Sequence, residues 1–255
     1  MLRSDRLRAA LFTYGVQPRG GVVHALSLAE ALPSAGVDAT LFALDDTHAG
    51  LFRAARCPVV LVPIERPPPG DVLASVRARI GAYVEALDAM GEPLRAFDVH
   101  HAFDGIGGNA LATLAERGTI DGFVRTVHHL DDFAQPELAA LQDRSIRSAT
   151  LRLTGSPTWR ERIAARYGVD AELAPSGVDL ERFTPASTAR RAALRERLGV
   201  STGPLFLSIG GVEPRKNAIG ILEAFARVRA ARPGARLAIA GGASVLDHGA
   251  YRRAF

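Results

Sequence analysis

The sequence is poor in cysteine and in long apolar runs. Cys57 is the single cysteine among 255 residues, which excludes an intramolecular disulfide and a cysteine-based metal cage. The longest apolar run, residues 57–64, has the length of a strand and is far shorter than the roughly 18 residues that a membrane helix needs. Residues 1–16 lack the apolar core and small-residue cleavage site of a signal peptide, so we expect a cytoplasmic protein.

Motifs of several enzyme classes are also missing. The chain contains no G-x-S-x-G nucleophile elbow, no G-x-x-x-x-G-K-[ST] phosphate loop and no H-E-x-x-H metalloprotease motif. Aromatic residues make up only 6% of the chain and the arginines are scattered, which disfavours nucleic-acid binding. The net charge of +4 indicates a solvated, arginine-rich surface, with attraction to an anionic membrane or a phosphorylated substrate as the alternative.

Apolar strand patterns alternate with amphipathic helix patterns along residues 1–180. Such alternation predicts a parallel sheet covered by helices on both faces, so the fold class is α/β and residues 1–180 form a Rossmann-like domain. Asp71 and Ser156 stand where helix N-caps are expected, and Pro157 suits the first helical position.

The remaining chain begins a second α/β domain. Residues 181–203 are expected to form a linker with a short charged helix, and residues 204–255 hold two strands, a helix from about Lys216 to Ala231 and the beginning of another helix. Two strands and one complete helix cannot bury a parallel sheet. We therefore predict that this second domain is incomplete and exposes apolar sheet surface.

A glycine turn, PRGG, stands where the first strand passes into the first helix. Gly20 and Gly21 let the backbone bend tightly, and the helix N-terminus that follows attracts anions. The spacing is not the G-x-G-x-x-G dinucleotide fingerprint, and Asp45 is only a loose candidate for the ribose-binding acid. The turn predicts a phosphate site, with a purely structural turn as the alternative.

Residues 210–217, GGVEPRKN, repeat this arrangement and hold the one lysine of the chain beside 30 arginines. A helix is expected to start near Arg215, where positive charge is unfavourable for the helix dipole unless an anion binds. Lysine offers a compact charge with three donors that rotate onto phosphate oxygens. Lys216 is therefore predicted to contact a phosphate; the alternative is that the lysine stands here by chance.

Two histidine pairs follow strand patterns. His100 and His101 precede Asp104, and His128 and His129 precede two further acids, Asp131 and Asp132. Ligands bind at the carboxyl ends of parallel strands, so both pairs stand at the right edge of the sheet. Neighbouring residues of a strand point to opposite faces, which disfavours a metal cluster and favours one polar substrate contact per pair. For His100 and His129 the alternative is a core histidine with satisfied hydrogen bonds.

Taken in order, these segments resemble the family 4 glycosyltransferases, which have the GT-B fold of two facing Rossmann-like domains. The segments that carry the resemblance are PRGGVVHALSLAEAL, FDVHHAFDGIGGNAL, RTVHHLDDF, LTGSPTWRERI, SGVDLERFTP, LFLSIGGVEPRKNAIGILEAFARV and ARLAIAGG. The family carries a pair of glutamates later in its second domain, and this chain stops at Phe255 before any such segment. The sequence thus resembles a member truncated within the donor-binding domain.

The resemblance implies retaining transfer of a sugar from a nucleotide-sugar donor to an acceptor, with no cofactor and no metal. Arg215 and Lys216 match the basic pair that holds the donor diphosphate, and His128 matches a histidine expected near the reacting carbon. Further substrate-binding residues are implied at Gly20, Gly21, Gly211, Asn217 and His129. The acceptor is a small molecule, a lipid or a polysaccharide precursor, and peripheral association with the inner membrane face is compatible with it.

Two other functions remain open at this point. One is a truncated, non-catalytic module that binds an acceptor or a partner through the first domain and an exposed, unfinished sheet edge. The other is an NAD(P)-dependent oxidoreductase, which the absent dinucleotide fingerprint disfavours. Binding of a nucleoside diphosphate but not of NAD would separate the glycosyltransferase from the oxidoreductase.

Overall fold

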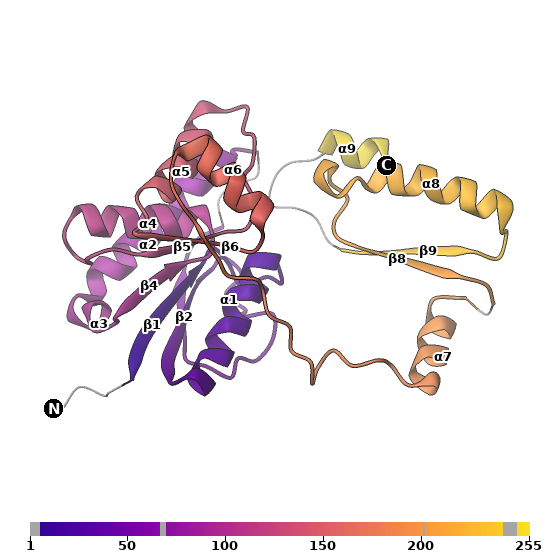
Figure 1. Ribbon diagram of the computed structural model, residues 1–255, viewed down its shortest axis with the longest axis horizontal. Helices are drawn as coiled ribbons and strands as arrows, with labels where there is room; N and C mark the ends of the chain where they lie inside the picture. The colour runs from indigo at the N-terminus through magenta and orange to yellow at the C-terminus, as the bar shows by residue number, and fades with distance from the viewer. Residues whose placement is uncertain (1–5, 67–69, 201, 242–248) are drawn as a thin grey trace. The chain divides into compact units, whose positions relative to one another are not determined.

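The computed structural model describes residues 6–66, 70–200, 202–241 and 249–255, which divide into two compact units, Met1–Gly177 and Val178–Phe255. Each unit consists of parallel strands with helices between them, which confirms the α/β class (Figure 1).

The first unit is built on one parallel sheet in the order β3-β2-β1-β4-β5-β6-β7. The strands are β1 (Leu7–Thr13), β2 (Val37–Asp45), β3 (Val59–Pro63), β4 (Val99–Ala102), β5 (Val124–Val127), β6 (Leu151–Thr154) and β7 (Glu172–Leu173). The two-residue β7 was not expected, because a pair this short leaves no pattern in the sequence.

Helices connect the strands as the periodicity predicts. They are α1 (Gly20–Ala31), a 3-10 turn η1 (Leu32–Ala35), α2 (Val72–Met90), α3 (Glu92–Arg95), α4 (Gly105–Glu116), α5 (Pro136–Arg147) and α6 (Pro157–Tyr167). Both expected N-caps are confirmed, since the side chains of Asp71 and Ser156 accept hydrogen bonds from the amides of Ala74 and Trp159. Among the described residues, no helix is both long and apolar enough to cross a bilayer.

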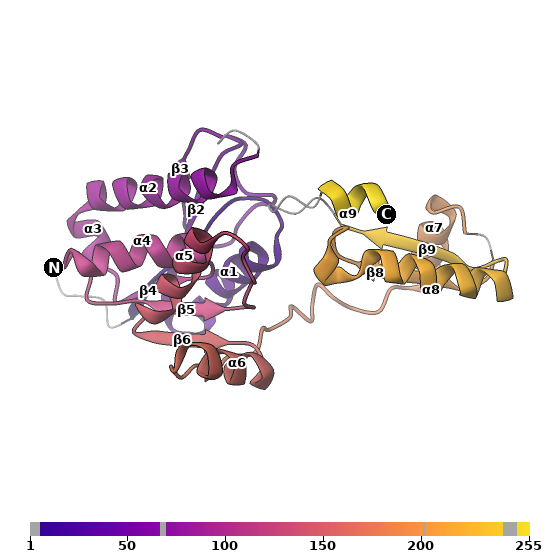
Figure 2. The same cartoon turned by 90° about the horizontal axis from the view of Figure 1, so that it is seen from above.

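Helices cover both faces of the sheet of the first unit (Figure 2), and a separate apolar core is buried on each face. Along β1, Ala10 and Phe12 pack against α2 and α4, whereas Ala9 and Leu11 pack against α1. This alternation follows from the period of two in a strand. Each face of the sheet buries its own apolar side chains. A shift of β1 by one residue in its pairing would therefore move each of these side chains to the other face.

The strand order reverses between β1 and β4, and the buried carboxylate of Asp104 joins the two strand ends at that point. Its Oδ2 accepts a hydrogen bond from the backbone amide of Tyr14 at 2.8 Å, and its Oδ1 caps α4 by accepting from the amide of Gly107 at 2.8 Å. Burial raises the pKa of Asp104, while these hydrogen bonds and Arg125 oppose the increase. The carboxylate therefore fixes the entrance to the carboxyl edge of the sheet.

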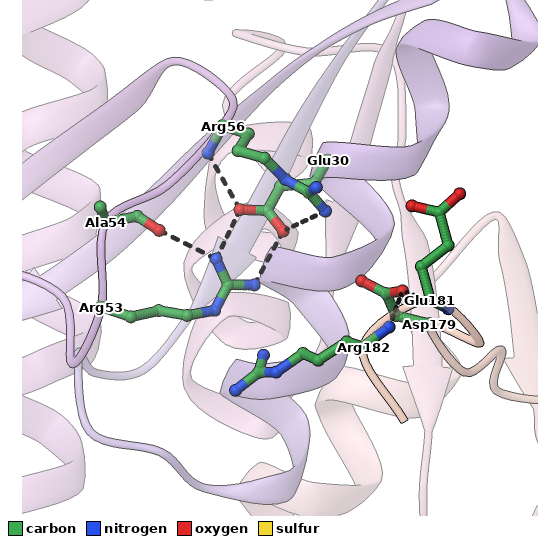
Figure 3. Close-up of polar contacts among 7 residues, drawn as sticks. All are labelled: Glu30, Arg53, Ala54, Arg56, Asp179, Glu181 and Arg182. Atoms are coloured by element: carbon green, nitrogen blue, oxygen red, sulfur yellow. Dashed lines mark hydrogen bonds and ion pairs between the residues drawn. The ribbon is translucent and has the colours of Figure 1, made fainter. Parts of the chain in front are cut away.

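An ion pair on α1 anchors the loop between β2 and β3 (Figure 3). Arg53 binds the buried carboxylate of Glu30 with two hydrogen bonds, of 2.6 and 2.7 Å, and the backbone amide of Arg56 adds a third at 2.9 Å. The bond from Arg53 is the main reason that the pKa of Glu30 lies below its usual value. The loop is thus held to the helix that begins with the glycine turn.

The second unit contains α7 (Thr188–Arg197), β8 (Leu205–Ile209), a 3-10 turn η2 (Pro214–Lys216), α8 (Ala218–Ala231), β9 (Arg236–Ala240) and α9 (Gly249–Ala254). β8 and β9 pair in parallel, and Phe206 faces Phe225 of α8 with ring centroids 6.0 Å apart. The helix α8 begins at Ala218, two residues later than the sequence suggested, because Pro214–Lys216 form a separate turn.

One face of this small sheet is exposed, as predicted. Leu207 and Ile209 alternate with Phe206 along β8, so they point away from α8, and they are 61% and 77% exposed. Within the described residues of this unit, two strands and their helices leave that apolar face in water, which agrees with the general rule that so few strands do not close a core.

We expect Glu30→Ala to lower the free energy of unfolding of the first unit by about 3 kcal/mol, because it leaves the Arg53 guanidinium without its buried partner. The single tryptophan, Trp159, lies in α6 of this unit, so its fluorescence during urea unfolding measures the change. Glu92→Ala is the matched control: its ion pair with Arg95 is largely exposed, and its loss should cost less than 1 kcal/mol. Equal losses in the two variants would contradict the buried anchor.

Candidate functional site

The glycine turn of the first unit lies at the carboxyl edge of the sheet, as its position after β1 predicts. Gly20 and Gly21 are the first two residues of α1, and Arg19 occupies the N-cap position without a capping side-chain bond. No heavy atom outside the neighbouring residues lies within 4 Å of a Cβ built on Gly20. The first turn of α1 therefore presents backbone amides next to open space, an arrangement that suits an anion.

His128 lies directly against this turn, so the structure brings together two residues predicted independently. It follows the last residue of β5, and a Cβ at Gly21 would lie 3.8 Å from its Nε2 and Cδ2. The Nε2 atom is buried and has no hydrogen-bond partner in the described part of the chain. The same Cβ would lie 3.7 Å from the carbonyl oxygen of Phe103, the residue after β4.

Sequence reasoning missed the third member of this group, His24. Its ring lies one helical turn after Gly20 and Gly21, 5.2 Å from the ring centroid of His128 and 5.2 Å from that of Phe103. The signal was available: a histidine three to four residues after the glycines falls on the same helix face as they do. We call Gly21, His24, Phe103 and His128 the imidazole cluster.

The histidines around the cluster are held neutral. Burial is the main cause that lowers the pKa of His128 to about 4 and that of His101 to about 3, and it also lowers the pKa of His24. Each protonated ring would also repel the others and the buried Arg125, which adds to the decrease. At neutral pH each of these rings thus offers one donor and one acceptor nitrogen rather than a charge.

The neighbouring residues His100 and His101 of β4 point to opposite faces of the sheet, as the strand geometry predicts. His100 is buried on the α4 side of the sheet with Nε2 3.1 Å from the carbonyl of Leu94, so it is a core histidine. His101 points to the other face and shares a 2.7 Å hydrogen bond with Thr126. His129 is not a core histidine, because it is partly exposed with Nε2 3.3 Å from Asp131. In the part of the chain that the structure describes, no three His, Cys, Asp or Glu side chains are placed to hold a metal ion.

Asp45, the loose candidate for a ribose-binding acid, forms hydrogen bonds within its own loop. Its oxygens accept hydrogen bonds from the amide and hydroxyl of Thr47 and from the amide of Gly50. Burial alone would raise its pKa, but these bonds outweigh it and lower the pKa of Asp45. A carboxylate that closes its own loop is not free for a ribose, which further disfavours the dinucleotide hypothesis.

An open cavity of about 520 Å³ lies at the opposite, amino edge of the sheet. It is lined by the first residues of three strands, Val99, Val124 and Leu151, together with Asp98 and Asp121. Asp98 already accepts a hydrogen bond from the amide of Arg8. Ligands of open parallel sheets bind at the carboxyl edge, so we place the candidate site at the imidazole cluster rather than in this cavity.

In the second unit, the predicted basic pair lies in the turn η2 and not in the first turn of a helix. The turn ends at Asn217, whose φ of +51° is left-handed and separates η2 from α8. The amide of Lys216 donates to the carbonyl of Glu213, and that of Asn217 to the carbonyl of Pro214. Neither cation therefore lies in the first turn of a helix. The unfavourable interaction with the helix dipole that the sequence suggested is largely avoided.

The two cations of the turn differ in their surroundings. Arg215 donates to the buried carboxylate of Glu213 at 3.2 Å, so part of its charge is balanced within the loop. Lys216 is exposed, and among the described residues no side chain forms an ion pair or hydrogen bond with its ammonium group. Lys216 thus provides the uncommitted positive charge of this turn.

Glycines make room for the lysine. Gly210 has a φ of +143°, and a Cβ there would lie 3.2 Å from Cγ and Cδ of Lys216. The aliphatic part of Lys216 therefore lies on the bare backbone at the end of β8. The neighbouring residues Gly211 and Asn217 complete the turn, and the hydroxyl of Tyr251 accepts from the amide of Ile219 in the first turn of α8.

The charge of the chain is concentrated in the second unit. Residues 178–255 contain 13 lysines and arginines against six acids, a net charge of +7, whereas the first unit has a net charge of −3. A positive field of this kind attracts anionic ligands and raises their local concentration. The net charge of the whole chain, +4, does not reveal this difference between the two units.

Residues 18–182, more than half of the chain, match the family model of Glycosyltransferase Family 4. A D-inositol 3-phosphate glycosyltransferase from Arthrobacter sp. (strain FB24) is 27% identical over 235 residues, which are 84% of this chain and 55% of that protein. A GDP-mannose-dependent alpha-(1-6)-phosphatidylinositol monomannoside mannosyltransferase from Mycobacterium tuberculosis (strain ATCC 25618 / H37Rv) is 36% identical over 144 residues, which are 54% and 37%. The chain thus spans about half the length, or less, of these curated relatives.

Solved structures show a similar fold. Anabaena HepE in complex with UDP and glucose superposes with a TM-score of 0.71 at 15% identity, covering 98% of this chain and 64% of that one. The catalytic domain of starch synthase IV from Arabidopsis thaliana, bound to ADP and acarbose, gives a TM-score of 0.71 at 14% identity and covers 93% and 69%. These likenesses confirm the GT-B-like fold of the chain.

We predict that acid destabilises the first unit through its neutral histidines. Their folded pKa values lie below the value of about 6.5 in an unfolded chain, so their contribution is complete above pH 6.5 and is lost as the pH falls towards 4. At pH 5, His101 and His128 should each lower the free energy of unfolding by about 2 kcal/mol relative to pH 7.5.

Urea unfolding followed by Trp159 fluorescence at pH 7.5 and pH 5 measures this change. His101→Gln should reduce the dependence on pH, whereas His48→Asn, which removes an exposed imidazole at a left-handed position that asparagine accepts, should leave it unchanged. A stability that is equal at the two pH values would show that these histidines are not held neutral.

Proposed function

The chain belongs to Glycosyltransferase Family 4, and on this premise we propose that it transfers a sugar from a nucleotide-sugar donor to an acceptor with retention of the anomeric configuration. Because the chain spans only part of its relatives, the proposal concerns the activity of the protein to which these residues belong. The observation that carries it most directly is the uncommitted ammonium group of Lys216, lying on bare glycine backbone at the end of β8.

We assign Lys216 to the donor diphosphate. When the bond between the sugar carbon and the diphosphate oxygen breaks, negative charge grows on the departing group, and a fixed cation lowers the barrier by stabilising it. Arg215 would add a second cation, weaker in effect because Glu213 shares its charge. Gly211 and Asn217 would let the backbone approach the phosphates closely.

His128 is assigned to the sugar. As a neutral imidazole at the carboxyl edge it would form a hydrogen bond with a hydroxyl of the donor sugar near the reacting carbon. Gly20 and Gly21 would face the diphosphate or the acceptor with backbone amides, and His129 would contribute a further polar contact beside Asp131. In this proposal the two cations and the backbone amides neutralise the diphosphate without a metal ion.

The names of the curated relatives suggest the substrate class. Four of them are GDP-mannose-dependent mannosyltransferases for phosphatidylinositol monomannosides, and two are D-inositol 3-phosphate glycosyltransferases. We therefore propose a nucleoside diphosphate sugar as donor and an acceptor that carries a polyol phosphate. If that acceptor is a lipid headgroup, the protein would work while bound peripherally to a membrane surface, to which the basic second unit would be attracted.

Lys216→Ala should weaken the binding of GDP or UDP by ten- to a hundredfold, the effect of losing charge-assisted hydrogen bonds to phosphate of about 1.5–3 kcal/mol. Isothermal titration calorimetry measures this on the chain of 255 residues. Arg215→Ala should have a smaller effect, because Glu213 already balances part of that charge.

Arg227→Ala is the matched control: it removes one exposed charge from α8 of the same unit and leaves the turn intact. Unchanged affinity in Lys216→Ala would refute the assignment of the lysine. Binding of NAD in place of nucleoside diphosphates would refute the proposed function, as would the absence of sugar transfer when GDP-mannose or UDP-glucose is supplied with phosphatidylinositol or inositol phosphate.

A further inference from the structure

Two buried ring nitrogens in the imidazole cluster lack hydrogen-bond partners. They are Nδ1 of His24 and Nε2 of His128, and neither has a partner within the described part of the chain. A buried polar atom left unpaired costs about 1–3 kcal/mol, so two such atoms in one cluster call for an explanation. Both rings contact Phe103, which excludes water from that side.

The distance between the rings provides that explanation. Their centroids lie 5.2 Å apart and their planes are tilted by 58°. Two imidazoles joined by an N–H···N hydrogen bond of about 3 Å have ring centres roughly 5 Å apart, because each nitrogen lies close to its ring centre. A small rotation of the two rings would therefore pair the two nitrogens with each other without any displacement of α1 relative to β5.

We propose that His24 is a positioning residue for His128: it donates a hydrogen bond from Nδ1 to Nε2 of His128 and so determines which nitrogen of His128 carries the proton. In a neutral imidazole, a hydrogen bond at one ring nitrogen sets the protonation of the other. With Nε2 as the acceptor, His128 carries its proton on Nδ1. The statement about His128 and substrate rests on the proposed function; the pairing of the two rings does not.

The direction of the hydrogen bond follows from the start of α1. Nε2 of His128 lies against Gly21, in the first turn of the helix, where the dipole is positive. A positive potential favours a lone pair at that nitrogen over an N–H group. His24 therefore donates and His128 accepts.

Burial is the main reason that both rings are neutral, since it lowers the pKa of His24 and of His128. For His128, Arg125 from β5 and His129 beyond the end of β5 lower the pKa further, and His101 from β4, itself held neutral by burial, faces the pair from the neighbouring strand. Asp104, the buried carboxylate nearby, is committed to the amides of Tyr14 and Gly107. The pair is thus a hydrogen bond between neutral imidazoles and not an ion pair.

The pairing would determine whether His128 donates a hydrogen bond to a ligand or accepts one from it. Because Nε2 is buried, Nδ1 is the nitrogen that remains to face a bound molecule, and in the proposed tautomer it is a donor. His128 would then donate to an oxygen of the donor sugar instead of accepting from a hydroxyl. Loss of His24 would leave the ring in place against Phe103 but free to exchange tautomers.

Nitrogen-15 NMR of the chain of 255 residues, labelled at histidine, tests the pairing without any substrate. In the wild type we expect His128 to show a protonated Nδ1 and an unprotonated Nε2 at pH 7.5. His24→Phe keeps an aromatic ring against Phe103 but removes the donor, so the signals should move towards a mixture of tautomers. His24→Asn returns an amide near the position of Nδ1 and should restore most of the single tautomer, while His48→Asn should change nothing.

A wild-type His128 protonated at Nε2, or a tautomer unaffected by His24→Phe, would overturn the proposal. Should His24→Phe fail to fold, as judged by Trp159 fluorescence, the wild-type spectrum still decides, since it reports the tautomer directly. For an active enzyme, His24→Phe should lower kcat about tenfold with little change in KM. If His24→Phe changes the tautomer but the protein transfers no sugar, the proposed function is refuted. The pairing of His24 with His128 still holds in that case.

Discussion

Parallel pairing of β1 with β2 on one side and β4 on the other is the constraint on which the site of the first unit depends. Parallel strands all end at the same edge, so whatever follows them in the sequence meets there. The turn after β1, the start of α4 and the residue after β5 belong to distant parts of the chain and become neighbours for this reason alone. Asp104 secures that edge with one hydrogen bond to each of two segments.

Burial then determines what the residues at this edge can do. A histidine in water titrates near neutral pH, but desolvation keeps the rings of His24, His101 and His128 uncharged. An uncharged ring at the carboxyl edge can recognise hydroxyl groups through direction and tautomer, which a charged ring does with much less discrimination. The chemistry offered by the first unit is therefore hydrogen bonding, not charge.

The second unit, in contrast, offers positive charge. It carries a net charge of +7, and its turn η2 exposes a lysine whose stem lies on glycine backbone. Glu213 moderates Arg215 but leaves Lys216 available. The two units thus differ in the interactions that they offer: neutral hydrogen-bonding rings in the first and exposed positive charge in the second.

Much of the fold could be predicted because it depends on local patterns. Apolar runs of strand length, amphipathic helices and the caps at Asp71 and Ser156 follow from backbone preferences that act over a few residues. The unexpected elements, such as β7, are too short to produce a pattern. The start of α8 was placed too early because the left-handed Asn217, which interrupts the helix, depends on the loop around it.

The sequence by itself determined the α/β class, the two glycine turns, the lone lysine and the histidine at the end of β5. Only the tertiary structure decided the partners of these residues: His24 beside His128, Glu213 against Arg215 and Asp45 closed on its own loop. Strand and helix patterns reflect preferences that act between near neighbours, whereas the contact of His24 with His128 arises from packing of α1 against the end of β5, and the hydrogen bonds of Glu213 and Asp45 depend on how their loops fold. Packing depends on burial and distance, which no single stretch of sequence contains.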